Sequence, residues 1–76
     1  MYVDIKEKDK RKELLCLLEK KSYKYKNFKR DDILKSDLPI HIYLETKEIG
    51  MLGNRNYVKV SNIKYTSYED VLDFFK

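Results

Sequence analysis

The 76 residues are 42% hydrophobic and 39% charged, and they predict one folded domain with a thin core over residues 1–76. A chain this short buries only about 60% of its unfolded surface. No apolar run approaches the roughly 18 residues of a membrane-spanning helix, and no signal-peptide pattern is present. The single Cys16 excludes an intrachain disulfide, so we expect a protein of a reducing compartment, the cytoplasm.

The positive charge lies in the first half of the chain. Residues 1–38 carry twelve Lys and Arg against eight Asp and Glu, whereas residues 39–76 carry five of each. The first half therefore accounts for the whole net charge of +4. A local excess of this kind favours an anionic partner, either nucleic acid or an acidic protein surface.

The first half of the chain predicts a short strand followed by a helix. Residues 2–5 alternate between polar and apolar types, which indicates a strand. Residues 8–21 predict a helix whose apolar stripe is formed by Leu14, Leu15 and Leu18. Residues 23–26 alternate again and predict a short extended segment. Residues 27–39 predict a loop with one helical turn at 31–35.

The second half predicts strands and a final helix. The clearest strand is 40–45, and a turn joins it to a partner strand at 48–52. Residues 56–60 and 63–65 predict two further short strands. The apolar face of the last helix is formed by Tyr68, Val71, Leu72 and Phe75.

Two residue pairs compete to cap this last helix. Thr66 with Glu69 fits the capping-box pattern better than Ser67 with Asp70, so we expect the first pair. The order of elements is then β-α-β-β-β-α. We predict an α+β fold, in which a small antiparallel sheet has both helices packed on one face, because each helix has one apolar side to bury.

The residue types needed for catalysis or metal binding are sparse. A metal site needs several ligands, but the chain holds one histidine, His41, and one cysteine, Cys16. We interpret Cys16 as a small apolar filler in a leucine-rich helix and His41 as a surface residue. Gly50 and Gly53 stand between predicted strands, as in turns, rather than before a helix, as in a phosphate-binding loop. We expect no enzyme activity, no metal and no cofactor.

The first candidate binding surface is residues 20–30, which we call the basic segment. It contains three aromatic residues, no acidic residue and six basic ones: Lys20, Lys21, Lys24, Lys26, Lys29 and Arg30. Basic side chains neutralise phosphates and rings stack on bases, so six contacts to a single strand predict a salt slope of roughly −4. An alternative remains open, in which Tyr23 and Tyr25 belong to the core and the lysines form a solvated face. Contact with an acidic protein is a third interpretation.

The second candidate surface is the side of the sheet that the helices leave uncovered. His41 and Tyr43 point to this side of their strand, and Tyr57 and Lys59 are predicted to join them. Tyrosine is frequent at interfaces because its ring is apolar and its tip polar. This side is a candidate partner or homodimer interface, with scattered exposed tyrosines as the alternative. Arg55, in a predicted polar loop, is a further candidate anchor.

Two stretches of the chain resemble short accessory proteins of bacteriophages and mobile elements. Residues 17–25 are similar to a "Leu-Leu-x-x-x-Gly-Tyr-Lys-Trp" pattern, with Ser22 and Tyr25 in place of the usual Gly and Trp. Residues 67–72 are similar to a "Ser-Tyr-Glu-Asp-Phe-Leu" helix. These motifs are structural, so the resemblance assigns no site residue. It implies a group that includes anti-CRISPR and other anti-defence inhibitors, which work by stoichiometric binding.

We therefore expect a small non-enzymatic binding protein, encoded by a phage or mobile element, in the host cytoplasm. The expected partner is a host protein or a protein–nucleic-acid complex, such as a CRISPR-type defence effector, that this chain occludes or modulates. One alternative is a basic nucleic-acid-binding module that uses the basic segment. A second alternative is a sponge for nucleotide signals, in which tyrosines stack on bases and basic side chains hold phosphates.

Overall fold

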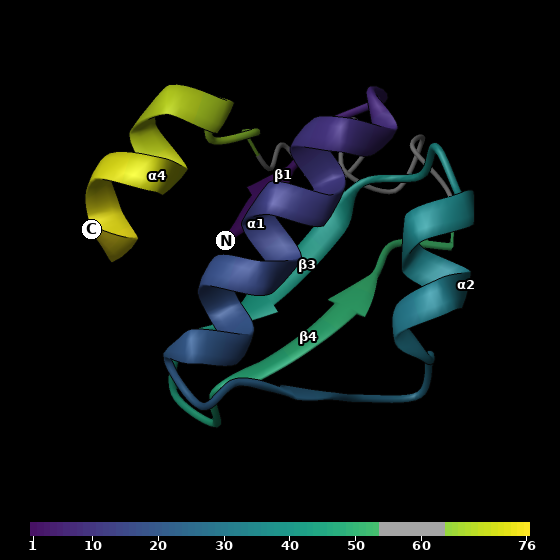
Figure 1. Cartoon of the computed structure of the whole chain (residues 1–76), viewed down its shortest axis with the longest axis horizontal. Helices are drawn as coiled ribbons and strands as arrows, with labels where there is room; N and C mark the ends of the chain where they lie inside the picture. Colours follow the sequence, from purple (N-terminus) through teal and green to yellow (C-terminus); the bar gives the residue numbers. More distant parts are fainter. Residues whose placement is uncertain (54–63) are drawn as a thin grey trace.

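The computed structural model describes residues 1–53 and 64–76. The elements in these two ranges are β1 (Tyr2–Val3), α1 (Lys8–Lys20), β2 (Lys24–Tyr25), α2 (Arg30–Lys35), β3 (Ile40–Tyr43), β4 (Glu48–Met51) and α4 (Tyr68–Phe75) (Figure 1). The predicted strand at 56–60 lies outside the described residues. Of the predicted strand at 63–65, the two described residues, Lys64 and Tyr65, are not in a strand. No helix in the described ranges is long and apolar enough to cross a membrane.

The sheet is mixed, with strand order β1-β3-β4-β2. β1 pairs with β3, and β3 with β4, in antiparallel fashion, whereas β2 pairs with β4 in parallel. The α+β class is confirmed, but the expectation of a wholly antiparallel sheet is wrong. The reason is the connection through α1, because a helix returns the chain so that the next strand runs in the original direction. The β3–β4 hairpin then lies between β1 and β2.

The helical turn predicted at 31–35 is confirmed and is part of the six-residue helix α2, in which Ile33 is fully buried. The predicted cap of the last helix needs correction. The helix α4 is capped by Ser67, whose hydroxyl accepts a hydrogen bond from the Asp70 N–H at 3.1 Å, so the preference for Thr66 was wrong. The Thr66 N–H instead donates to the Tyr2 carbonyl at 2.7 Å, which joins the segment before α4 to β1.

The core lies on one face of the sheet, which we call the inner face. All three described helices contribute to it, and Figure 1 shows α1 crossing the sheet with α2 and α4 on either side. Ile40 and Ile42 point to this face from β3, and Ile42 lies opposite Ile49 of β4. Leu44 would share this face if the strand ran over the predicted 40–45, but it follows the end of β3 and is 40% exposed. The predicted stripe of α1 is confirmed, since its three leucines are fully buried.

A buried arginine was not predicted. Arg11 of α1 has no exposed surface, and its guanidinium donates to three main-chain carbonyls. These acceptors are Ile33 of α2 at 2.8 Å, Ile5 before α1 at 2.7 Å and Leu38 before β3 at 2.8 Å. Hydrogen bonds to each acceptor offset the cost of removing a charge from water. Arg11 thus joins α1 to α2 and to the segments that enter α1 and β3.

Candidate binding surface

The face of the sheet opposite the helices, which we call the outer face, carries a row of aromatic side chains. His41 and Tyr43 alternate with the buried Ile40 and Ile42, so they point away from the core. Tyr2 of β1 lies opposite His41, and the centroids of the two rings stack 4.2 Å apart. The centroids of His41 and Tyr43 are 3.8 Å apart. We call Tyr2, His41 and Tyr43 the aromatic row, and all three are half-buried.

Gly50 makes room for the ring of Tyr43. A Cβ atom at Gly50 would lie 3.2 Å from Tyr43 Cε2 and 3.8 Å from the Tyr43 hydroxyl oxygen. The ring therefore lies over β4, where a larger residue would displace it. On this ring stands Lys26, whose Nζ is 4.7 Å from the centroid, in a cation–π contact. The aromatic row and its lysine thus extend from β1 to the residue after β2.

Two lysines of the basic segment share the outer face with the aromatic row. Lys24 is in register with Glu48 of β4, and Glu48 is in register with Tyr43 of β3, which places these side chains on one face. Lys26 follows two residues after Lys24 and contacts Tyr43 as described. The structure therefore unites Lys24, Lys26 and Tyr43, which the sequence had suggested as parts of two separate surfaces.

Of the other four basic residues of the segment, three are exposed lysines and the fourth, Arg30, forms an ion pair. The three exposed lysines are Lys20, Lys21 and Lys29. Arg30 Nε lies 3.0 Å from Glu19 Oε2, and another guanidinium nitrogen of Arg30 lies 3.6 Å from Cys16 Sγ. Because Glu19 compensates the charge of Arg30, the positive field of the segment comes mainly from its lysines.

The tyrosines of the basic segment belong to the core and its rim. Tyr23 is buried and contacts Phe75 of α4 edge to face, with centroids 5.6 Å apart. Tyr25 is half-buried, and its hydroxyl donates to the Glu19 carboxylate. Burial raises the pKa of Tyr25, and the Glu19 carboxylate raises it further. The burial of Tyr23 agrees with the interpretation in which the segment's tyrosines are core residues, and Tyr25 packs against the rim of that core.

The electrostatic surroundings of His41 are positive. Burial lowers the pKa of His41 from its usual 6.5, and the positive charges of the N-terminal amine and of Lys26 lower it further. His41 is the only histidine of the chain. At neutral pH its imidazole is therefore mainly uncharged and offers one N–H donor and one nitrogen acceptor.

An open pocket of about 310 Å³ lies at the end of the aromatic row. Its lining includes Met1, His41, Tyr43, Glu45 and Thr46. Two of its lining residues, Met1 and Ile42, are joined through their main chains, because the Ile42 N–H donates to the Met1 carbonyl at 2.8 Å and the N-terminal amine donates to the Ile42 carbonyl at 3.0 Å. These hydrogen bonds hold one part of the pocket's lining in place.

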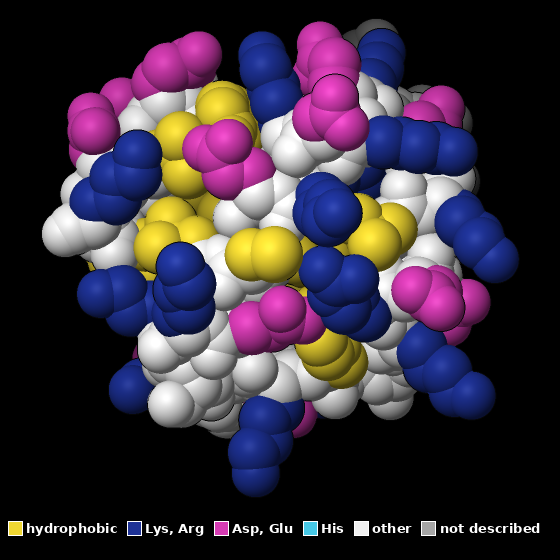
Figure 2. All heavy atoms as spheres, viewed as in Figure 1, with side chains coloured by type: hydrophobic (Ala, Val, Ile, Leu, Met, Phe, Trp, Pro, Cys, Tyr) yellow, Lys and Arg dark blue, Asp and Glu magenta, His cyan; other side chains and the backbone are white. Residues whose placement is uncertain are grey.

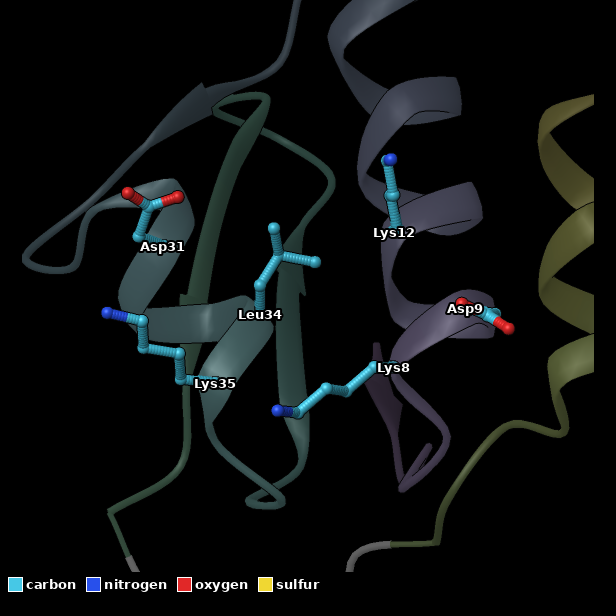
Figure 3. Close-up of a pocket in the computed structure, with 6 residues that line it drawn as sticks. All are labelled: Lys8, Asp9, Lys12, Asp31, Leu34 and Lys35. Atoms are coloured by element: carbon cyan, nitrogen blue, oxygen red, sulfur yellow. The ribbon is translucent and has the colours of Figure 1, made fainter.

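The helical side of the molecule carries charges of both signs. Figure 2 shows basic and acidic side chains interspersed there, with apolar side chains visible between them. A pocket of about 260 Å³ between α1 and α2 is lined by Lys8, Asp9, Lys12, Asp31, Leu34 and Lys35 (Figure 3). Lys8 extends toward α2, whereas Asp9 points away from it. Three lysines and two aspartates around one leucine favour neither an anionic nor a cationic ligand.

The remaining predicted site residues, Arg55, Tyr57 and Lys59, lie outside the described residues. Tyr2 and Gly50 belong to the outer face but were not among the predicted site residues. The alternation at residues 2–5 was a signal for Tyr2, but its position beside His41 depends on strand order. In the ranges 1–53 and 64–76, no group of three or more His, Cys, Asp or Glu residues is placed to hold a metal ion.

Comparisons of this chain with protein families, with curated proteins and with solved structures found no match.

Proposed function

We propose that this chain is a non-enzymatic binding protein, encoded by a phage or mobile element, that occludes a host protein such as a defence effector. In this proposal the contact surface is the outer face, with the aromatic row at its centre and Lys24 and Lys26 beside it. The observation that carries the proposal is the row itself, three half-buried rings on the side away from the core, in which His41 contacts both Tyr2 and Tyr43. The phage context rests on the resemblance of residues 17–25 and 67–72 to phage accessory proteins.

The arrangement of the rings favours a protein partner over stacked bases. His41 is flanked by Tyr2 and Tyr43, with centroids 4.2 Å and 3.8 Å away, and Lys26 lies over Tyr43. A base stacks on an open ring face, and these contacts occupy ring faces. What the row offers is ring edges and polar tips, which suit the mixed apolar and hydrogen-bonding contacts of a protein interface.

The charge of the outer face favours an acidic partner surface. Lys24 and Lys26 project from it, and Glu48 is the acidic residue in register with Lys24. Complementary charge across an interface increases the association rate and selects among partners. The host protein in this proposal therefore presents a carboxylate-rich surface to the row.

A second candidate function is nucleic-acid binding by the lysines of the basic segment. The observation in its favour is the exposure of Lys20, Lys21 and Lys29. In this case phosphate contacts supply the affinity, so binding weakens steeply as salt increases.

Capture from host lysate tests the leading proposal when three versions of the chain are compared. Wild type and Lys35→Gln, a control on α2 away from the outer face, should recover the same host protein, whereas Tyr43→Ala should lose it. The captured protein should also bind purified wild-type chain with a Kd at least tenfold lower than its Kd for Tyr43→Ala. Equal recovery by Tyr43→Ala would contradict the assigned surface. Recovery of no host protein at any salt concentration would contradict the function.

A further inference from the structure

The pocket at the end of the aromatic row is lined by residues that suit a ligand atom which accepts hydrogen bonds. Its lining residues include His41, Tyr43 and Thr46, each of which has a side chain that can donate a hydrogen bond. Lys26 stands over the ring of Tyr43 and adds a fixed positive charge at the same end of the row. Several donors around an open volume, with a cation beside them, suit an acceptor that carries negative charge.

We propose that this pocket is a carboxylate-binding site, in which an acidic side chain of the partner protein accepts a hydrogen bond from His41 beside Lys26. This proposal rests on the proposed function, since it names the chemistry of the partner at the outer face. The carboxylate binds best when His41 is protonated, because the imidazolium then supplies both a donor and a charge. Binding is therefore coupled to the uptake of a proton by His41.

The groups around His41 decide whether such coupling can occur. The imidazole faces Tyr2 on β1 and Tyr43 on its own strand, and the position opposite it on β4 is Gly50, which has no side chain. The charges that act on the imidazole are those of the N-terminal amine and Lys26, and both are positive. In the free protein burial is the main cause that lowers the pKa of His41, these two charges lower it further, and an incoming carboxylate opposes this shift.

Acidic neighbours set a limit on the affinity. Glu45 lines the same pocket and is exposed, while Glu48 is half-buried across from Tyr43 and in register with Lys24. A carboxylate entering the pocket is repelled by Glu45. Glu45→Gln should therefore tighten binding of an acidic ligand by a few fold, without loss of a core contact, because Glu45 is exposed.

The single histidine allows a direct measurement with poly-L-glutamate as the probe. NMR titration of the His41 ring proton gives its pKa in the free protein and in the presence of saturating probe. We expect the probe to raise this pKa by one unit or more. By linkage, a one-unit rise means that the protonated protein binds the probe about tenfold more tightly than the neutral form. The Kd should therefore decrease several-fold from pH 7.5 to pH 5.5.

Variants separate the role of His41 from general charge attraction. His41→Gln should lose most of the pH dependence of the Kd over this range, and what remains is the contribution of the N-terminal amine, whose pKa is lowered by burial. Lys26→Gln should bind more weakly at every pH but keep the pH dependence, and Lys35→Gln on α2 should behave as wild type. Thermal unfolding of each variant shows that it is folded under the assay conditions.

Each alternative result has a defined meaning. Binding of poly-L-glutamate without a change in the pKa of His41 would overturn the carboxylate site but leave the outer face as a protein-binding surface. Failure of the probe to bind between pH 5.5 and 7.5 would also overturn the site, while the lysate experiment would still decide the proposed function. Tighter binding of an oligothymidylate, with the same rise in the pKa of His41, would show that the ligand group is phosphate and would contradict the proposal.

Discussion

The two faces of one four-stranded sheet are built from different kinds of residue. The inner face carries aliphatic side chains such as Ile40, Ile42 and Ile49, all fully buried beneath the helices. The outer face carries half-buried rings and exposed lysines, and Lys26 contacts the ring of Tyr43. Burial of apolar area is the main favourable term in folding, so the inner face supplies most of the stability. The outer face keeps surface in contact with solvent, and that surface is what a partner can bind.

The largest expected effect comes from Arg11, the one polar residue among the fully buried side chains of the described ranges. Arg11→Ala leaves the carbonyls of Ile5, Ile33 and Leu38 without this donor. Each buried group left without its partner costs about 1–3 kcal/mol. With three carbonyls affected, we expect the free energy of unfolding to fall by roughly 3 kcal/mol or more. A domain of this length is stable by only roughly 4–11 kcal/mol, so urea denaturation should show the loss clearly.

Two further variants identify the cause of that loss. Arg11→Met fills most of the volume but donates no hydrogen bond, so it should be nearly as unstable as Arg11→Ala. Lys12→Ala removes an exposed charge from the next position of α1 and should change the stability little. If Arg11→Met were as stable as wild type, the three carbonyls would not depend on the guanidinium.

Substitutions of two neighbouring residues of β3 allow a direct comparison of how much each face contributes to stability. Ile42→Ala removes a fully buried side chain of the inner face and should cost about 2–5 kcal/mol. Tyr43→Ala removes a half-buried ring of the outer face and should cost clearly less, while reducing partner binding. Chemical denaturation gives the two stabilities, and Kd values for the captured host protein give the binding. If Tyr43→Ala cost as much stability as Ile42→Ala, Tyr43 would have to be regarded as a core residue.

Much of the inner face could be predicted from periodicity, whereas on the outer face periodicity placed only His41 and Tyr43. Leu14, Leu15 and Leu18 follow the helical repeat, and Arg11 falls on the same stripe, three and four residues before the first two. That phase was the signal for its burial, but a charged residue at such a position is more often solvated. Tyr2 could not be placed beside His41, because cross-strand neighbours depend on strand order.

The parallel pairing of β2 likewise could not be predicted from the sequence pattern. β2 has two residues, Lys24 and Tyr25, too few to carry a register signal of their own. Its place beside β4 follows from the path of α1 across the sheet, which is a tertiary effect. The union of Lys24 with Tyr43 depends on that pairing, so the combined surface became visible only in the structure.

A smaller effect is expected where the outer face meets the backbone of β4. Gly50→Ala places a Cβ atom 3.2 Å from Tyr43 Cε2, so the ring has to move by a few tenths of an ångström. We expect the free energy of unfolding to fall by about 1 kcal/mol or less, which is at the low end of the cost of adding volume to a packed site. The displaced ring should shift the NMR resonance of the neighbouring His41 ring proton and weaken partner binding. Unchanged His41 resonance and unchanged Kd would show that the row tolerates the extra methyl group.

The smallest effect, and the one most specific to the outer face, is the pH dependence contributed by His41. Its pKa in the folded state is lowered from 6.5, mainly by burial, so between the two values the unfolded chain binds more protons. The contribution of His41 to stability is therefore fully present above pH 6.5 and decreases as the pH falls toward the folded-state pKa. Carboxylates also titrate in acid, so the quantity to measure is the difference in unfolding free energy between wild type and His41→Gln. This difference should decrease from pH 7.5 to pH 5.5. A difference that stayed constant, or that increased in acid, would mean that the surroundings of His41 do not favour its neutral form.

Partner binding has the opposite pH dependence in our proposal, since a bound carboxylate favours the protonated form of His41. The same imidazole should thus lower the stability of the free protein in mild acid while strengthening its complex.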